Sequence, residues 1–420
     1  MNVKLNKLII IGLILGFIIS LLGLIFMASC PRNSVTDCLI EKEDLMPDFY
    51  WHINTIKYIS SNWELPYQIS EYKDESQGGL KDVIHGPLYY FIGAGLWSLS
   101  MKIGVNPLII LHLFSIFLTL IANILFFLLI KRVSKDTNFK KQFILVSILI
   151  FIFFPLNLYI SLIIHNHALF LMLLIFSFYL YSRSLEQRNL RNSCFLGISL
   201  GLGLLSSSMI IPLFLAIFIY TFLNYIFKKD RNIRFIALSL ILGFIIGFFT
   251  LIRNYLLYGN PIWGRVIATL QERSFFNLVR VGKAFFSGAY GGFPLIVNLI
   301  SIISIFITII SVYGFFCWIN KERGRKFKEA NVTSLIFLTG IITLVLSFHS
   351  VCNLYSLLNN FICLGGDMIH GRHLLPIVPS ISISFALGLT KLFRKRRLIA
   401  CILMIIIILY SLDFLYVWIN

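Results

Sequence analysis

Charged residues are scarce in this sequence. Only 13% of its residues are Asp, Glu, Lys or Arg, whereas 58% are hydrophobic, and a soluble domain carries about 25% charged residues. Apolar runs such as 8–29, 106–130 and 295–316 reach the length of about 18 residues that indicates a membrane span. The composition therefore excludes a soluble globular protein and predicts an all-α integral membrane protein.

Acidic residues are the scarcer of the two charged classes. The sequence has 36 Lys and Arg against 18 Asp and Glu, which gives a formal net charge of +18. Clusters of basic residues beside span ends are typical of cytoplasmic loops, whereas a nucleic-acid-binding protein carries its basic patch on one soluble face. The excess positive charge therefore indicates topology rather than a nucleic-acid partner. The basic residues gather in short clusters between apolar runs, at 131–141, 183–191, 228–234, 321–328 and 391–397.

One apolar segment, 86–104, breaks the alternation of spans. If it crossed the membrane, every later basic cluster would lie on the outer side. Its glycines and its aromatic start fit a helix that lies in the plane of the membrane interface. With this segment on the outer surface, we expect about eleven transmembrane helices, with the N-terminus in the cytoplasm and the C-terminus outside. The expected spans are 8–29, 106–130, 143–162, 166–182, 194–207, 209–227, 235–253, 293–319, 331–349, 374–390 and 398–417.

The spans form one predicted transmembrane domain, 1–420, with outer loops at 30–105, 254–292 and 350–373. Ten of the 18 acidic residues lie between positions 31 and 86, in the first outer loop. A loop that must stay solvated explains this concentration, and so does a catalytic or metal-binding surface. Both interpretations remain open from composition alone.

Within that loop, Asp48 and His52 are four residues apart. On a helix that begins near Asp48, these two residues and Thr55 share a face, while Ile53 and Ile56 point elsewhere. Asp48 follows Pro47 and also fits an N-cap, whose carboxylate accepts backbone N–H groups. Capping and catalysis are compatible, because a capped helix start holds its carboxylate rigidly.

Four stretches resemble the GT-C membrane glycosyltransferases, which include protein O-mannosyltransferases and lipid A aminoarabinose transferases. "PDFYWHINTIKYISSNWELP" (47–66) and "HGPLYYFIGAGLWSL" (85–99) are similar to the two interfacial helices of that family's first outer loop. "LIRNYLLYGNPIWG" (251–264) and "GRHLLPIVPSISISFALGL" (371–389) are similar to two later segments. The resemblance implies a GT-C-like fold in which interfacial helices occupy a large first extracytoplasmic loop.

The activity implied by the resemblance is transfer of a sugar from a polyprenyl-phosphate donor to a glycan, lipid or protein acceptor. The resemblance also implies that the active site lies on the extracytoplasmic side of a multi-pass protein of the cell membrane. Asp48 is then the general base for the acceptor hydroxyl, a role that typically contributes about 10²–10⁴-fold. The departing phosphate needs cationic or hydrogen-bonding partners. The candidates for this role are Lys81, His85, Arg253 and Arg372.

Further residues are candidates for contacts to the acceptor or to a divalent metal ion, the one cofactor that the sequence suggests. They are His52, Asp82, Asp367 and His373. Topology places His165 and His167 near the outer face as well, but no tight metal-ligand spacing recurs. The second of two adjacent acids common in the family is replaced by Phe49. Two cysteine pairs are placed outside, where disulfides form readily: Cys30 with Cys38, and Cys352 with Cys363.

Three other functions are compatible with a chain of this type. A lipid or oligosaccharide transporter would carry ionisable groups near the bilayer midplane, where this chain has mainly Asp413. A polysaccharide polymerase or ligase would more often have its large loop between late spans. A relative that kept the fold without activity is the third, for which the residue Phe49 is the only indication.

Overall fold

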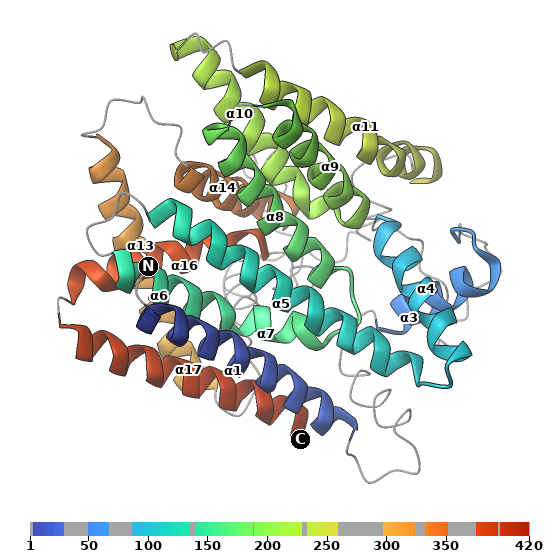
Figure 1. Ribbon diagram of the computed structural model, residues 1–420, viewed down its shortest axis with the longest axis horizontal. Helices are drawn as coiled ribbons and strands as arrows, with labels where there is room; N and C mark the ends of the chain where they lie inside the picture. Colours follow the sequence, from blue (N-terminus) through green and yellow to red (C-terminus); the bar gives the residue numbers. More distant parts are fainter. Residues whose placement is uncertain are drawn as a thin grey trace, which may run out of the picture.

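The computed structural model of the chain describes residues 3–28, 49–66, 86–134, 140–187, 189–228, 233–258, 297–323, 332–351, 375–393 and 395–419. Their regular secondary structure is helical throughout (Figure 1). The first half of the chain contributes α1 (Val3–Ala28), α3 (Phe49–Asn62), α4 (Leu88–Lys102), α5 (Pro107–Val133), α6 (Lys140–Ile152), α7 (Pro155–Leu162), α8 (His167–Glu186) and α9 (Leu190–Ser206). The second half contributes the short 3₁₀ helix η3 (Ser208–Ile210), α10 (Ile211–Lys228), α11 (Ile233–Tyr258), α13 (Val297–Arg323), α14 (Val332–Val351), α16 (Val378–Leu392) and α17 (Arg396–Ile419).

The prediction of a multi-pass all-α membrane protein is confirmed. Each predicted span coincides with a helix or a helix pair, and the expected break between 194–207 and 209–227 lies where α9 gives way to η3 at Ser207. Five helices are long and apolar enough to cross a membrane, or six if α6 and α7 count as one broken span. The apolar parts described for α9, α10, α13, α14 and α17 are shorter, so the total of eleven crossings stays a prediction.

The predicted span 143–162 coincides with the helix pair α6 and α7, which is bent rather than straight. Its chain bends by 46° between α6 and α7, because Pro155 lacks the N–H that would bond the preceding turn and its ring would clash with that turn's carbonyl. Pro155 instead occupies the first turn of α7, where no N–H is needed. The carbonyl of Phe151, freed by the break, accepts a hydrogen bond from the Asn157 side chain at 2.8 Å.

Close packing through small residues joins the later helices. A Cβ atom on Gly314 of α13 would overlap the carbonyl of Ser384 in α16, and one on Gly388 of α16 would overlap the carbonyl of Ile310. Lipid tails are as apolar as the side chains, so helices in a membrane associate through close van der Waals contact of this kind. The glycines therefore set the distance between α13 and α16.

The two short helices α3 and α4 lie together at one end of the bundle, beside the start of α5 (Figure 1). They have 14 and 15 residues, fewer than the roughly 20 that cross a bilayer. Ile56 of α3 packs against Gly93 of α4, where an added Cβ would lie 3.0 Å from Ile56 Cδ1. Lys57 lies 5.3 Å from the centroid of the Trp97 ring. The pair thus forms a unit that covers this end of the bundle, and its place in the membrane interface remains a prediction.

Candidate functional site

Helix α3 begins at Phe49, directly after Asp48, as the sequence predicts. His52, one turn into the helix, is only 4% exposed. The hydroxyl of Tyr90, from α4, lies 2.7 Å from His52 Nδ1, and the two rings are nearly parallel at 8° with centroids 5.6 Å apart. A hydrogen bond between the two short helices therefore fixes the orientation of the His52 ring.

Two further histidines meet His52 from the corner between α7 and α8. The His165 ring centroid lies 3.9 Å from that of His52 and 3.7 Å from that of His167. All three imidazoles are buried. Residues more than one hundred positions apart in the sequence thus form one buried cluster. This group, His52, Tyr90, His165, Asn166 and His167, is called the histidine site below.

The α7–α8 corner is held in place by side chains of α5. Helix α7 ends at Leu162, so the carbonyls of Leu162 and Ile163 have no partner in a following helical turn. His112 Nδ1 donates to the first of these carbonyls, and Ser115 Oγ donates to the second at 3.0 Å. Buried backbone carbonyls are costly without a donor, so these two bonds fix the corner that carries the imidazoles.

The end of α9 forms another wall beside the corner. Asn166 Nδ2 donates to the Ser206 carbonyl at 2.8 Å. A Cβ on Gly86, at the start of α4, would overlap the Leu205 carbonyl, so only glycine permits this approach. The Asn166 Oδ1 and Ser206 Oγ atoms are buried and have no hydrogen-bond partner among the described residues. The start of α4, the corner and the end of α9 thus meet around polar atoms that can still accept or donate.

Arg253, near the end of α11, is one of the residues predicted to bind the donor phosphate. Its Nη2 atom donates to the Pro66 carbonyl at 2.7 Å. This bond ties α11 to the segment that follows α3, on the same covering unit that carries His52. Phosphate binding by Arg253 therefore stays a prediction, while its contact with the segment that follows α3 is established.

Several predicted site residues lie outside the described residues, and their roles stay predictions. They are Asp48, Lys81, Asp82, His85, Asp367, Arg372 and His373. The predicted pairs Cys30–Cys38 and Cys352–Cys363 lie there too, as does most of the loop 254–292. Among the cysteines that are described, Cys194, Cys317 and Cys401 are free thiols.

The prediction of a metal ion finds limited support in this geometry. Within the described parts of the chain, no three His, Cys, Asp or Glu side chains are arranged to hold a metal ion. The three imidazoles lie ring against ring rather than directed at one common point. The described residues alone therefore do not fit a metal centre.

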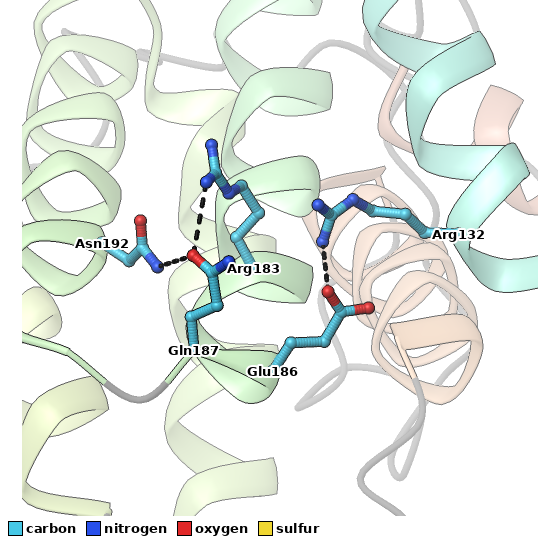
Figure 2. Close-up of polar contacts among 5 residues, drawn as sticks. All are labelled: Arg132, Arg183, Glu186, Gln187 and Asn192. Carbon is cyan, nitrogen blue, oxygen red and sulfur yellow. Dashed lines mark hydrogen bonds and ion pairs between the residues drawn. The ribbon is translucent and has the colours of Figure 1, made fainter.

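The opposite ends of α5 and α8 carry a different set of polar contacts (Figure 2). Arg132 Nη1 lies 2.8 Å from Glu186 Oε2 in a partly exposed ion pair. The Gln187 side-chain oxygen accepts from Arg183 and Asn192, each at 3.3 Å. Exposed pairs of this kind contribute little to stability, about 0–1 kcal/mol. The two ends of the bundle thus differ in chemistry, with arginines at one end and buried imidazoles at the other.

Comparison with known proteins supports the resemblance seen in the sequence. A model of the dolichyl-phosphate-mannose-protein mannosyltransferase family matches residues 85–252, from just before α4 into α11. The match includes Tyr90, the α7–α8 corner and the end of α9. It covers 168 of the 420 residues. No curated protein sequence matches the chain.

The fold is similar to that of the oligosaccharyltransferase of Archaeoglobus fulgidus. Its apo crystal structure has a TM-score of 0.58 at 12% identity and covers 97% of this chain and 56% of that one. Its complex with Zn and sulfate has a TM-score of 0.50 at 14% identity, with coverages of 97% and 52%. The same enzyme tethered to an acceptor peptide has a TM-score of 0.50 at 13% identity, with coverages of 99% and 55%. The chain therefore spans about half the length of that enzyme, and the predicted GT-C-like fold is confirmed.

Proposed function

We propose that this protein is a membrane glycosyltransferase that moves a sugar from a polyprenyl-phosphate donor to an acceptor on the extracytoplasmic side. The observation that carries the proposal is the histidine site, which assembles at one end of a GT-C-like bundle and includes His52, four positions after Asp48 in the sequence. The family model that matches residues 85–252 describes enzymes that use dolichyl-phosphate-mannose. The positions that form most of the site's walls fall inside that match.

In the proposed reaction, the acceptor oxygen attacks the anomeric carbon of the donor sugar. The bond from that carbon to the phosphate oxygen breaks, and polyprenyl phosphate leaves with the bonding electron pair. The proton of the acceptor hydroxyl passes to the Asp48 carboxylate. The transition state is oxocarbenium-like, as in glycoside hydrolysis, so negative charge grows on the departing phosphate.

The position of Asp48 suits a general base. It directly precedes α3, whose first backbone N–H groups have no helical partners and favour a carboxylate beside them. The bond between Tyr90 and His52 holds the first turn of α3 against α4. In this proposal the carboxylate is positioned by its helix, and the helix by the histidine site.

The departing phosphate is assigned to the basic residues around this end of the bundle. Arg253 is held beside the first outer loop by the Pro66 carbonyl, and its planar guanidinium suits phosphate oxygens. Lys81, His85 and Arg372 belong to the same proposed group. The acceptor is a glycan, a lipid or a protein, and the bilayer holds the polyprenyl chain of the donor.

The orientation in this proposal rests on the positive-inside rule. The N-terminus is cytoplasmic, and the end of the bundle that carries α3 and α4 faces outward. The archaeal enzyme of similar fold was crystallised with Zn. A divalent ion here would require a carboxylate from outside the described residues, such as Asp48 or Asp82, beside the imidazoles. No step of the proposed reaction is routed through a metal.

The test is a donor panel with the purified protein in detergent. Polyprenyl-phosphate sugars are supplied with a crude envelope acceptor fraction, and the release of free polyprenyl phosphate is followed. We expect release that depends on both protein and acceptor with at least one donor. Protein-dependent movement of the intact donor across reconstituted vesicles, with no release from any donor, would contradict the proposal and favour a transporter.

A further inference from the structure

A stripe of polar side chains runs along α5, which is otherwise apolar. His112, Ser115, Thr119 and Asn123 follow one another at intervals of three, four and four residues, so they share one side of the helix. All four are buried. The stripe begins at the corner that carries His165 and ends at Asn123, the seventeenth of the 27 residues of the helix. Buried polar groups within a membrane span are costly and mark places where something must be bound or held.

Helix α5 packs against α6, α7 and α1 (Figure 1), and hydrogen bonds join its polar stripe to α7. Asn157 Nδ2 donates to Asn123 Oδ1 at 2.9 Å and to the Phe151 carbonyl at 2.8 Å. These two bonds use both hydrogens of the Asn157 amide. Its Oδ1 atom is buried and has no partner among the described residues.

The neighbouring hydroxyl groups have also committed their hydrogens. Thr119 Oγ1 donates to the Ser115 carbonyl at 3.0 Å. Ser161 Oγ lies 2.6 Å from the Leu158 carbonyl, and Ser20 Oγ lies 3.1 Å from the Gly16 carbonyl. Ser20 and Ser161 are 2.9 Å apart. Each hydroxyl has one hydrogen and two lone pairs, so this region offers acceptors and few donors.

A small cavity of about 10 Å³ lies among these groups. Its polar lining consists of Ser20, Thr119, Asn123 and Asn157. A volume of about 10–15 Å³ on this measure holds one water molecule, provided that two to four polar partners are present. The cavity meets both conditions, because at least Asn157 Oδ1 and Thr119 Oγ1 can each accept a further hydrogen bond.

We propose that this cavity binds a single water molecule that donates hydrogen bonds to Asn157 Oδ1 and Thr119 Oγ1. A donor ligand suits these two acceptors because the hydrogens of Asn157, Thr119 and Ser20 are already bonded to protein acceptors. Water is favoured over a monovalent cation because no lining residue is acidic, and an uncompensated charge within the bilayer is expensive. The water joins α5 to the bend at Pro155, in the way that ordered waters satisfy groups freed by broken membrane helices.

The direct test is a cryo-EM or crystal structure of the full chain at a resolution that shows ordered water. We expect one density peak within hydrogen-bond distance of both Asn157 Oδ1 and Thr119 Oγ1. Absence of that peak, while other buried waters are visible, overturns the proposal. A second crystal soaked in thallium(I) gives an independent result, since an anomalous peak at this position would assign a cation in place of water.

A pair of substitutions tests the same site in solution. Thr119→Val removes an acceptor from the cavity, and Thr339→Val is its control. Thr339 is buried in α14 and makes the same type of bond, to the Leu335 carbonyl at 2.8 Å, but does not line the cavity. We expect Thr119→Val to raise the unfolding equilibrium constant in detergent about threefold more than the control does, the average effect of a polar contact between membrane helices. Equal effects of the two substitutions contradict the proposal.

Discussion

The hydrogen bond between Tyr90 and His52 gives a prediction about stability. The same change, from Tyr to Phe, is expected to have different effects at Tyr90 and at Tyr181. Tyr90→Phe removes a hydroxyl that lies 2.7 Å from a buried imidazole nitrogen. Tyr181→Phe, in α8, removes a hydroxyl that is equally buried but has no hydrogen-bond partner among the described residues. The two substitutions delete the same atom from side chains of the same burial. They differ in whether that atom is paired.

The expected energies follow from that difference. Loss of a typical intramolecular hydrogen bond costs about 0.5–1.5 kcal/mol, and polar contacts between membrane helices average about 0.6 kcal/mol. We therefore expect Tyr90→Phe to reduce the free energy of unfolding by about 1 kcal/mol. Removal of an unpaired buried hydroxyl removes a desolvation cost, so Tyr181→Phe should leave stability unchanged or raise it. If His52 belongs to the active centre, only the first variant also loses activity, by about tenfold for each 1.36 kcal/mol of lost transition-state stabilisation.

Equilibrium unfolding in mixed detergent micelles, with both variants and the wild type measured side by side, checks the stability order. Turnover with the donor identified in the panel checks the activity. Equal stability losses for the two variants, or a larger loss for Tyr181→Phe, would refute the reasoning. Unchanged turnover in Tyr90→Phe would remove the histidine site from the mechanism while leaving its structural role intact.

Two other pairs of substitutions test how the end of the bundle is assembled. Gly86→Ala places a Cβ against the Leu205 carbonyl and should lower the yield of folded protein and its melting temperature. Gly95→Ala, in α4, places a Cβ that meets no atom within 4 Å. This control variant should be as stable as the wild type, or more stable by up to about 1 kcal/mol. A lower melting temperature for Gly95→Ala than for Gly86→Ala would contradict this packing. Arg253→Gln removes the bond to the Pro66 carbonyl and should speed proteolysis of the segment that follows α3. Arg132→Gln breaks a partly exposed ion pair and should change the free energy of unfolding by less than about 1 kcal/mol. Identical proteolysis of Arg253→Gln and wild type would show that the contact does not hold that segment.

The arrangement of helices follows closely from local sequence signals. Apolar length located the long helices, and the conflict that segment 86–104 created with the charge pattern set helix α4 apart from the predicted spans. The bend between α6 and α7 has a local signal as well, since Pro155 interrupts an apolar run and a proline inside a helix breaks it. The bend itself was not among the sequence expectations.

The histidine site follows from the sequence only in part. A helix start near Asp48 was expected, and His165 and His167 were placed near the outer face. Their contact with His52 depends on how α3 rests on the α7–α8 corner, and no local pattern specifies a contact between positions so far apart. Tyr90 and Asn166 were missed for the same reason, because each acts through one partner from a distant segment. The polar stripe on α5 had a readable signal, four polar residues at helical spacing within an apolar span.

The central claim, that Asp48 is the base of a glycosyl transfer, is tested most directly by comparing the wild type with Asp48→Asn and Glu64→Gln. Glu64 is a carboxylate two residues beyond the end of α3, where the Tyr58 hydroxyl donates to it at 2.8 Å, and it serves as a matched control. We predict that Asp48→Asn lowers the release of polyprenyl phosphate by about 10²-fold or more with unchanged donor binding, while Glu64→Gln stays near the wild-type rate. Wild-type release by Asp48→Asn, in folded protein that binds the donor, would contradict the account.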